Sequence, residues 1–147
     1  MSGILVGVDG SDHSRRALSW AMREAAHHHV PLTVMTVHQT PVRPATRIYW
    51  NVPDLPDRSF DPEIARMAVQ KMVDEVAKDL GETLPEIIVS VTTGDPAEEL
   101  VKASYDADML VVGSRGSGMF AKLLIGSVSS KVTHHAASPV VVIPSAG

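Results

Sequence analysis

Residues 109–128 read MLVVGSRGSGMFAKLLIGSV: an apolar run, a glycine-rich segment and then a Gly-Ser pair. Glycine permits a positive φ angle and carries no Cβ atom, so Gly113 and Gly116 allow successive backbone N–H groups to converge on an anion. Gly126-Ser127 opens a predicted helix, Ser127–His135, whose first turn offers unpaired N–H groups and the positive end of a helix dipole. This stretch predicts a strand, a phosphate-binding loop and a helix in succession.

Polar side chains in the same stretch favour a phosphate as the ligand. Ser127 and Ser129 add hydroxyl donors to the first turn of the helix, and Arg115 adds a fixed positive charge with a planar set of donors. One isolated glycine would more often indicate a turn that only joins a strand to a helix. The glycine spacing, the helix start and these donors together reverse that expectation.

Two common phosphate loops do not fit this stretch. Gly113 and Gly118 have the spacing of a P-loop, but Met119 and Phe120 stand where a lysine and a serine or threonine are required. A dinucleotide-binding fingerprint should be followed by a helix, a strand and an acidic ribose ligand, and no acid follows Asp108. The spacing that remains is Gly-x2-Gly-x9-Gly-Ser.

Length and composition predict one globular domain over residues 1–147. The chain has 147 residues, of which 44% are hydrophobic, enough to bury a core. Its formal net charge of −4 and the absence of a basic run argue against a nucleic-acid surface.

We expect a cytoplasmic protein with no membrane segment. No apolar run approaches the length of a membrane span, and Met1-Ser2-Gly3 passes into a predicted strand without a signal peptide. The chain has no cysteine, which excludes disulfides, thiol catalysis and zinc-thiolate sites and is compatible with a reducing compartment.

Strands and helices are expected to alternate along the whole chain. Short continuous apolar runs predict strands, and apolar residues at helical spacing between caps predict helices. The expected strands are 4–8, 32–38, 87–93, 109–112 and 140–143, and the expected helices are 12–28, 62–80, 96–105 and 127–135. Ser11, Asp61 and Asp95 are the expected N-caps of the first three helices.

The second helix and the segment before it carry two further expectations. The helix should bury one apolar stripe, made of Ile64, Met67, Ala68, Met72, Val73, Val76 and Leu80. Residues 39–61 are rich in proline and hold Tyr49 and Trp50, which predicts a long loop. A lid or partner surface and a flexible excursion with locally packed aromatics are equally compatible with that loop.

The alternation predicts an α/β fold: a single-domain three-layer sandwich with a five-stranded parallel sheet and helices on both faces. In such sheets, ligands bind at the carboxyl ends of the strands. With the strand order 3-2-1-4-5, Asp9 after the first strand and Gly113 after the fourth would flank one crevice. Asp9 could accept hydrogen bonds from ribose hydroxyls there, or it could serve only as an acid near the start of the first helix.

The Gly-x2-Gly-x9-Gly-Ser spacing resembles the ATP-binding signature of the universal stress protein family. The resemblance extends from the opening run 4–11, through Gly94-Asp95-Pro96, to the closing run 138–143. It implies an ATP-binding regulatory protein of the stress response. The implied nucleotide contacts are ribose at Asp9, adenine at the backbone near Val37, an adenosine slot lined by Val8 and Val112, and phosphates on Gly113, Arg115, Gly116, Gly126, Ser127, Val128 and Ser129.

The resemblance also bears on the adenine contact, the partners and the metal. Family members often end the second strand in His-Val, whereas this chain has Thr36-Val37-His38, so the adenine contact could be shifted by one residue. A terminal apolar strand must be covered, and the resemblance implies a homodimer through Val140, Val141, Val142 and Ile143. Magnesium or manganese would be held through the ATP phosphates, with no metal bound by protein ligands.

The histidine clusters do not have metal-ligand spacing. His27, His28 and His29 are consecutive, as are His134 and His135, whereas metal pairs on a helix need a separation of three or four residues. Histidine near the end of a helix is favoured by the helix dipole.

Three functions remain in competition. The first is a nucleotide-binding regulator that binds ATP and hydrolyses it slowly or not at all, with no catalytic residues. The second is a slow ATPase or phosphotransferase, and the third is a partner-binding scaffold with a vestigial pocket. The glycine-rich segment lacks the P-loop lysine, and Asp9 is the one obvious carboxylate of the site, which favours binding without fast hydrolysis.

Overall fold

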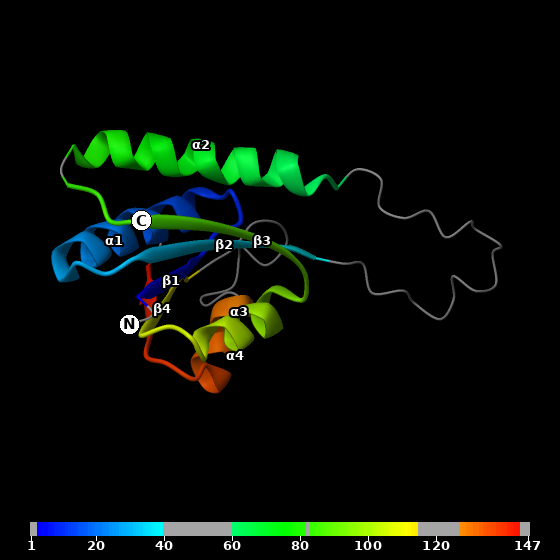
Figure 1. The fold of residues 1–147 in the computed structure, drawn as a ribbon. Helices are drawn as coiled ribbons and strands as arrows, with labels where there is room; N and C mark the ends of the chain where they lie inside the picture. The colour runs from blue at the N-terminus through cyan, green and yellow to red at the C-terminus, as the bar shows by residue number, and fades with distance from the viewer. Residues whose placement is uncertain (1–2, 40–59, 82, 115–126, 145–147) are drawn as a thin grey trace, which may run out of the picture.

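In the part of the chain that the structure describes, nine elements alternate between strand and helix. Figure 1 shows their arrangement. The computed structural model describes residues 3–39, 60–81, 83–114 and 127–144. The elements are β1 (Ile4–Gly7), α1 (Asp12–His28), β2 (Leu32–Gln39), α2 (Pro62–Leu80), β3 (Ile87–Gly94), α3 (Pro96–Ser104), β4 (Met109–Gly113), α4 (Ser127–His135) and β5 (Val140–Ile143). The expected elements are confirmed, and the ends of β1, β2, β3, α3 and β4 differ from the expected ends by one residue. Most of the expected loop, residues 40–59, lies outside the described residues.

The sheet is parallel and has the predicted order β3-β2-β1-β4-β5. Alternate residues of the central strands face two separate cores. Val6 and Val111 pack with α1 and α2 on one face, whereas Leu5 and Leu110 pack with α3 and α4 on the other. The three-layer sandwich with helices on both faces is therefore confirmed.

Side chains at the helix starts explain where α1, α2 and α3 begin. Ser11 accepts a hydrogen bond from the N–H group of Ser14, and Asp61 accepts one from Glu63. Asp95 accepts one from the N–H group of Glu98 at 3.0 Å. Each cap satisfies a backbone donor that has no partner within the helix. The three predicted N-caps are confirmed.

The expected buried stripe of α2 is wrong in its first two turns. Ile64 and Met67 are 65% and 67% exposed, and Ala68 is exposed as well, whereas Val69 and Met72 are buried. The reason is the offset between α2 and its neighbour α1, to which it is joined by an ion pair of 2.8 Å between Arg15 and Glu75. That pair places roughly ten residues of α2, about 15 Å of helix, beyond the start of α1. Figure 1 shows that α2 begins beyond the first turn of α1. The first turns of α2 thus have no α1 surface to pack against.

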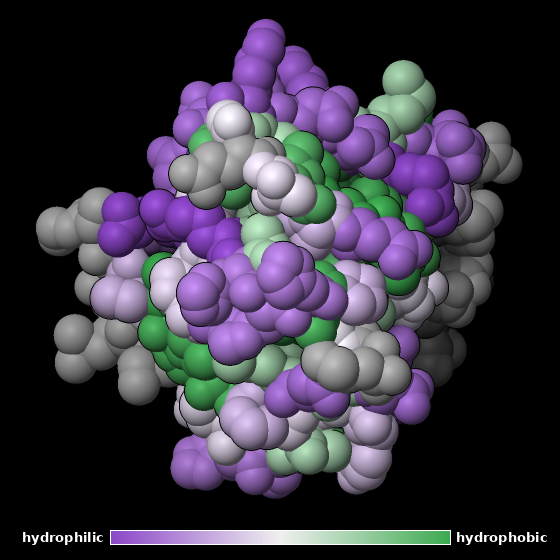
Figure 2. Space-filling model, turned by 60° about the vertical axis from the view of Figure 1, so that its left-hand side comes forward, coloured by the Kyte–Doolittle hydropathy of each residue, from purple (hydrophilic) through white to green (hydrophobic). Residues whose placement is uncertain are grey.

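The ion pair itself lies on the surface. The Arg15 side chain hydrogen-bonds to Glu75 and holds the pKa of that carboxyl below its usual value. On the face seen in Figure 2, hydrophobic residues appear as separate patches between hydrophilic ones. No helix in the described ranges is both long and apolar enough to cross a membrane.

The two edge strands are β3 and β5, and one carbonyl group of β3 is bound by a side chain. The Glu86 carbonyl accepts a hydrogen bond from the N–H group of Leu32 and therefore faces β2. Because alternate residues of a strand face opposite edges, the Val89 carbonyl faces away from the sheet. Arg66 of α2 donates to that carbonyl at 2.8 Å.

Candidate functional site

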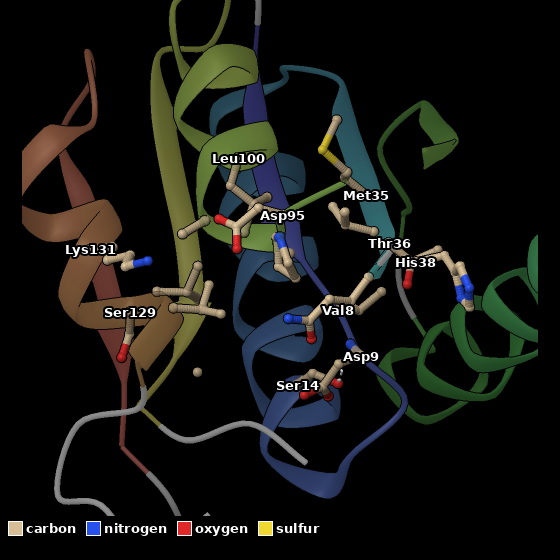
Figure 3. A pocket seen from close by; sticks show the side chains of 18 of the residues that line it. Val8, Asp9, Ser14, Met35, Thr36, His38, Asp95, Leu100, Ser129 and Lys131 are labelled. Atoms are coloured by element: carbon tan, nitrogen blue, oxygen red, sulfur yellow. Dashed lines mark hydrogen bonds between the residues drawn. The ribbon is translucent and has the colours of Figure 1, made fainter. Parts of the chain in front are cut away.

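A cleft of about 640 Å³ opens at the carboxyl ends of the strands. The ends of β1, β2 and β4 contribute to it, together with the first turns of α3 and α4 (Figure 3). The predicted site residues that line it are Val8, Asp9, Val37, Val112, Gly113, Val128 and Ser129. The structure therefore brings together residues from three strands that are distant in the sequence.

Asp9 belongs both to the cleft and to the start of α1. Its Oδ1 atom accepts hydrogen bonds from the N–H group of Ser11 at 2.9 Å and from the Ser11 hydroxyl. Its own N–H group donates to the Oγ atom of buried Ser14 at 3.2 Å. The two roles expected for Asp9 are therefore compatible, because one carboxylate oxygen fixes the turn while the residue remains exposed at the cleft.

The walls of the cleft beside Asp9 are apolar. Val8, Leu100 and Val112 are each at most 6% exposed and line the cleft. Gly7 shapes its floor, because a Cβ atom built there would lie 3.0 and 3.1 Å from the two methyl carbons of Leu100. A flat apolar ligand group therefore has buried side chains to pack against and a floor that carries no side chain at Gly7.

The backbone of β2 is open at the position expected for adenine. The Met35 carbonyl accepts a hydrogen bond from the N–H group of Val8 and so faces β1. By the alternation of a strand, the N–H and C=O groups of Val37 face the same side. The register with β1 ends at Met35, so no β1 residue lies opposite Val37. His38 faces β3 instead, opposite Thr93, whereas Val37 and, by the same alternation, Gln39 have backbone groups directed to the β1 side of the strand.

The phosphate end of the expected site is described only in part. Gly113 ends β4, Ser127 begins α4, and Arg115, Gly116 and Gly126 lie outside the described residues. The Oγ atom of Ser129, expected as a donor to phosphate, donates to the Ser114 carbonyl at 3.4 Å, and Ser129 is 2% exposed. This hydroxyl therefore also joins the start of α4 to the end of β4.

Several lining residues were not expected from the sequence. Asp95 and Lys131 carry opposite charges, and Figure 3 shows both side chains at the cleft. Asp95 is the N-cap of α3, and Lys131 belongs to α4. At the end of β2, the ring of His38 stacks on Phe60, with ring centroids 4.0 Å apart. Only Asp95 carried a sequence signal, since it follows β3 as Asp9 follows β1.

The histidine clusters lie away from this cleft. His28 contacts Glu24 at 2.9 Å, and the rings of His27 and His28 meet edge to face. Within the described part of the chain, no group of three or more His, Asp or Glu side chains is placed to hold a metal ion.

Comparison with known protein families matches residues 1–144 to the universal stress protein family. The chain belongs to this family. A universal stress protein of Mycolicibacterium smegmatis is 39% identical over 144 residues, which cover 96% of this chain and 47% of that protein. The chain spans about half the length of the curated relatives it matches.

Solved structures of the family share the fold. The universal stress protein UspA from Lactobacillus plantarum gives a TM-score of 0.77 at 25% identity, covering 97% of each chain. A universal stress protein in complex with cAMP gives 0.64 at 28% identity, covering 97% of this chain and 95% of that one. The protein from Archaeoglobus fulgidus in complex with dAMP gives 0.65 at 25% identity, covering 97% and 98%.

Proposed function

We propose that this chain binds an adenine nucleotide, ATP, in the cleft, and that it acts in the stress response by binding ATP rather than by hydrolysing it rapidly. The observation that carries the proposal is that three features meet at the carboxyl ends of the strands. These are the Asp9 turn, the open backbone of Val37 and the start of α4. They match the three parts of a nucleotide: ribose, base and phosphate.

The shape of the cleft supports a ligand of this size. Its volume of about 640 Å³ lies within the range of about 300 to 1,000 Å³ typical of small-molecule sites. Val8, Val112 and Leu100 supply apolar walls for a base, and Val37 supplies the polar groups that orient it. The cleft adds polar and charged side chains to these apolar walls, among them Asp9, Ser129 and Lys131, so it can both pack against a base and orient polar ligand groups.

The family neighbours support the adenine and phosphate parts of the assignment. The two ligands named above, cAMP and dAMP, share adenine and a phosphoryl group on the 5′ oxygen, and they differ at the ribose hydroxyls. ATP adds two phosphates, for which the proposed contacts are Gly113, Arg115, Gly116, Gly126, Ser127, Val128 and Ser129. Magnesium or manganese would enter with ATP and be held mainly by those phosphates.

Removal of Asp9 tests the binding proposal. Asp9→Ala should weaken ATP binding by about 10-fold to 150-fold, or about 1.5 to 3 kcal/mol, because hydrogen bonds to ribose are lost. Asp12→Ala is the matched control, since it removes an acid from the first turn of α1 but not from the cleft lining. Calorimetry should find near-normal affinity in the control, and equal affinity in Asp9→Ala would remove Asp9 from the site.

A turnover assay separates binding from the enzyme alternative. Phosphoryl transfer is accelerated by charges and metal ligands positioned on the phosphates and by a group that orients the nucleophile. The chain has no acid after Asp108, and Asp9 is assigned to ribose. We expect single turnover of radiolabelled ATP, with magnesium or manganese, to be far slower than about 1 per second. Faster turnover that is lost in Gly126→Asp would establish an ATPase.

Mass spectrometry of the ligand released from freshly purified, denatured protein tests the scaffold alternative. Co-purified ATP or AMP supports a functional pocket. A protein that carries no nucleotide and also fails to bind ATP in calorimetry would be a scaffold with a vestigial pocket.

A further inference from the structure

Asp95 lines the cleft at the point where the chain leaves β3 and enters α3, and Figure 3 shows it between Lys131 and Thr36. The register places Gly94 opposite Gln39, so Asp95 follows β3 just beyond the end of β2. In the order β3-β2-β1-β4, the end of β3 is three strand spacings from the end of β4, or roughly 14 Å. A ligand that extends from the end of β4 to Val37 therefore passes beside Asp95.

The two carboxylate oxygens of Asp95 have different surroundings. Oδ2 accepts the capping hydrogen bond from the N–H group of Glu98 at 3.0 Å. Among the described residues, none donates a hydrogen bond to Oδ1. Figure 3 shows this carboxylate at the cleft beside Leu100, which is 4% exposed. The cleft therefore presents a group that only accepts hydrogen bonds, beside an apolar wall.

We propose that Asp95 selects the base of the bound nucleotide by accepting a hydrogen bond from the exocyclic amino group of adenine. This proposal rests on the proposed function, because it requires an adenine nucleotide in the cleft. Adenine carries a donor at its 6-position, whereas hypoxanthine and guanine carry an oxygen acceptor there. An oxygen acceptor at that position would face the half-buried carboxylate with no donor between the two acceptors, which costs affinity.

The helix cap makes Asp95→Asn a directional test. Asparagine caps helices as well as aspartate does, but it has a single side-chain oxygen. If that oxygen accepts the Glu98 N–H group, the amide nitrogen is left facing the ligand. The variant then presents a donor where the native residue presents an acceptor, so the preference at the 6-position should reverse.

A second capping aspartate provides the matched control. Asp61 is also followed by a proline and also caps a helix, accepting from the N–H group of Glu63 at 2.9 Å. It is absent from the residues that line the cleft. Asp61→Asn therefore makes the same chemical change at the same kind of cap, without altering the ligand surroundings.

The experiment measures the affinities for ATP and for inosine triphosphate by calorimetry. We expect the native protein to prefer ATP by about 10-fold to 100-fold, Asp61→Asn to keep that preference, and Asp95→Asn to abolish or reverse it. A ratio in Asp95→Asn equal to the native ratio overturns the proposal. So does equal affinity of the native protein for ATP and purine riboside triphosphate, which lacks the amino group, and this comparison needs no variant. A native protein that binds none of these nucleotides overturns the proposed function as well.

Discussion

At Gly7, the end of β1 meets α3 closely enough that a side chain would have to share the space of Leu100. Leu100 is buried and also lines the cleft, so a side chain at residue 7 would push it towards the cleft. The absence of a side chain at this position therefore serves both the packing of α3 against the sheet and the volume available to a ligand. Substitutions here should affect stability and binding together.

Gly7→Val should lower the free energy of unfolding by about 1 to 3 kcal/mol, the usual cost of overpacking a core. It should also weaken ATP binding, because the displaced Leu100 side chain enters the cleft. Leu100→Ala in the Gly7→Val background should recover part of both losses, since it restores the space. Strictly additive effects in urea unfolding and in calorimetry would contradict this direct contact.

Helix α2 offers a matched pair of methionines that separates helical periodicity from burial. Met67 and Met72 belong to the same predicted apolar stripe, but Met67 is 67% exposed and Met72 is 8% exposed. Met72→Ala should cost about 2 to 5 kcal/mol of unfolding free energy, as truncations in a core do. Met67→Ala should change it by less than about 0.5 kcal/mol. Urea unfolding that gave equal losses would mean that the first turns of α2 are covered in solution.

Local signals explain why the fold is predictable from the sequence. Asp61-Pro62 and Asp95-Pro96 each start a helix through their own side chain and ring, with no need of distant contacts. The burial of α2 is not local in this sense. Periodicity identifies the apolar face of a helix, but the length of that face that is covered depends on the offset between α2 and α1.

The candidate site is predictable where the chain places residues at the ends of strands. Asp9 and Gly113 follow from that rule. Val8, Val37 and Val112 were implied by the family resemblance, and all five residues line the cleft. Lys131 does not follow from the rule, because it reaches the cleft only through the position of α4 beside α3. Asp95 was recognised only as a helix cap, although a carboxylate has two oxygens and can cap a helix with one while facing a ligand with the other.

For the whole molecule, the edge strand β5 leads us to predict a homodimer. The Pro139 and Ile143 carbonyls accept hydrogen bonds from β4, so the N–H and C=O groups of Val140 and Val142 face away from the sheet. These outward groups, on a strand of four apolar residues, form a template for pairing with a second copy.

Val142→Pro should weaken association while the fold is kept, because proline removes an N–H group that faces outward. Val141→Pro is the control: its N–H group faces β4, so this substitution should destabilise the monomer itself. Light scattering and thermal unfolding distinguish the two results. A native chain that remains monomeric at high micromolar concentration would exclude pairing through β5.

The hydrogen bond from Arg66 to the Val89 carbonyl gives the two margins of the sheet different capacities for growth. A subunit whose two edge strands were both free to pair could bind a further copy at each edge, so the assembly could grow without limit. Here the Arg66 guanidinium group opposes pairing at β3, since an incoming strand would have to displace it from the Val89 carbonyl. Pairing at β5 alone is self-terminating, because two copies related by a twofold axis use up each other's open margin.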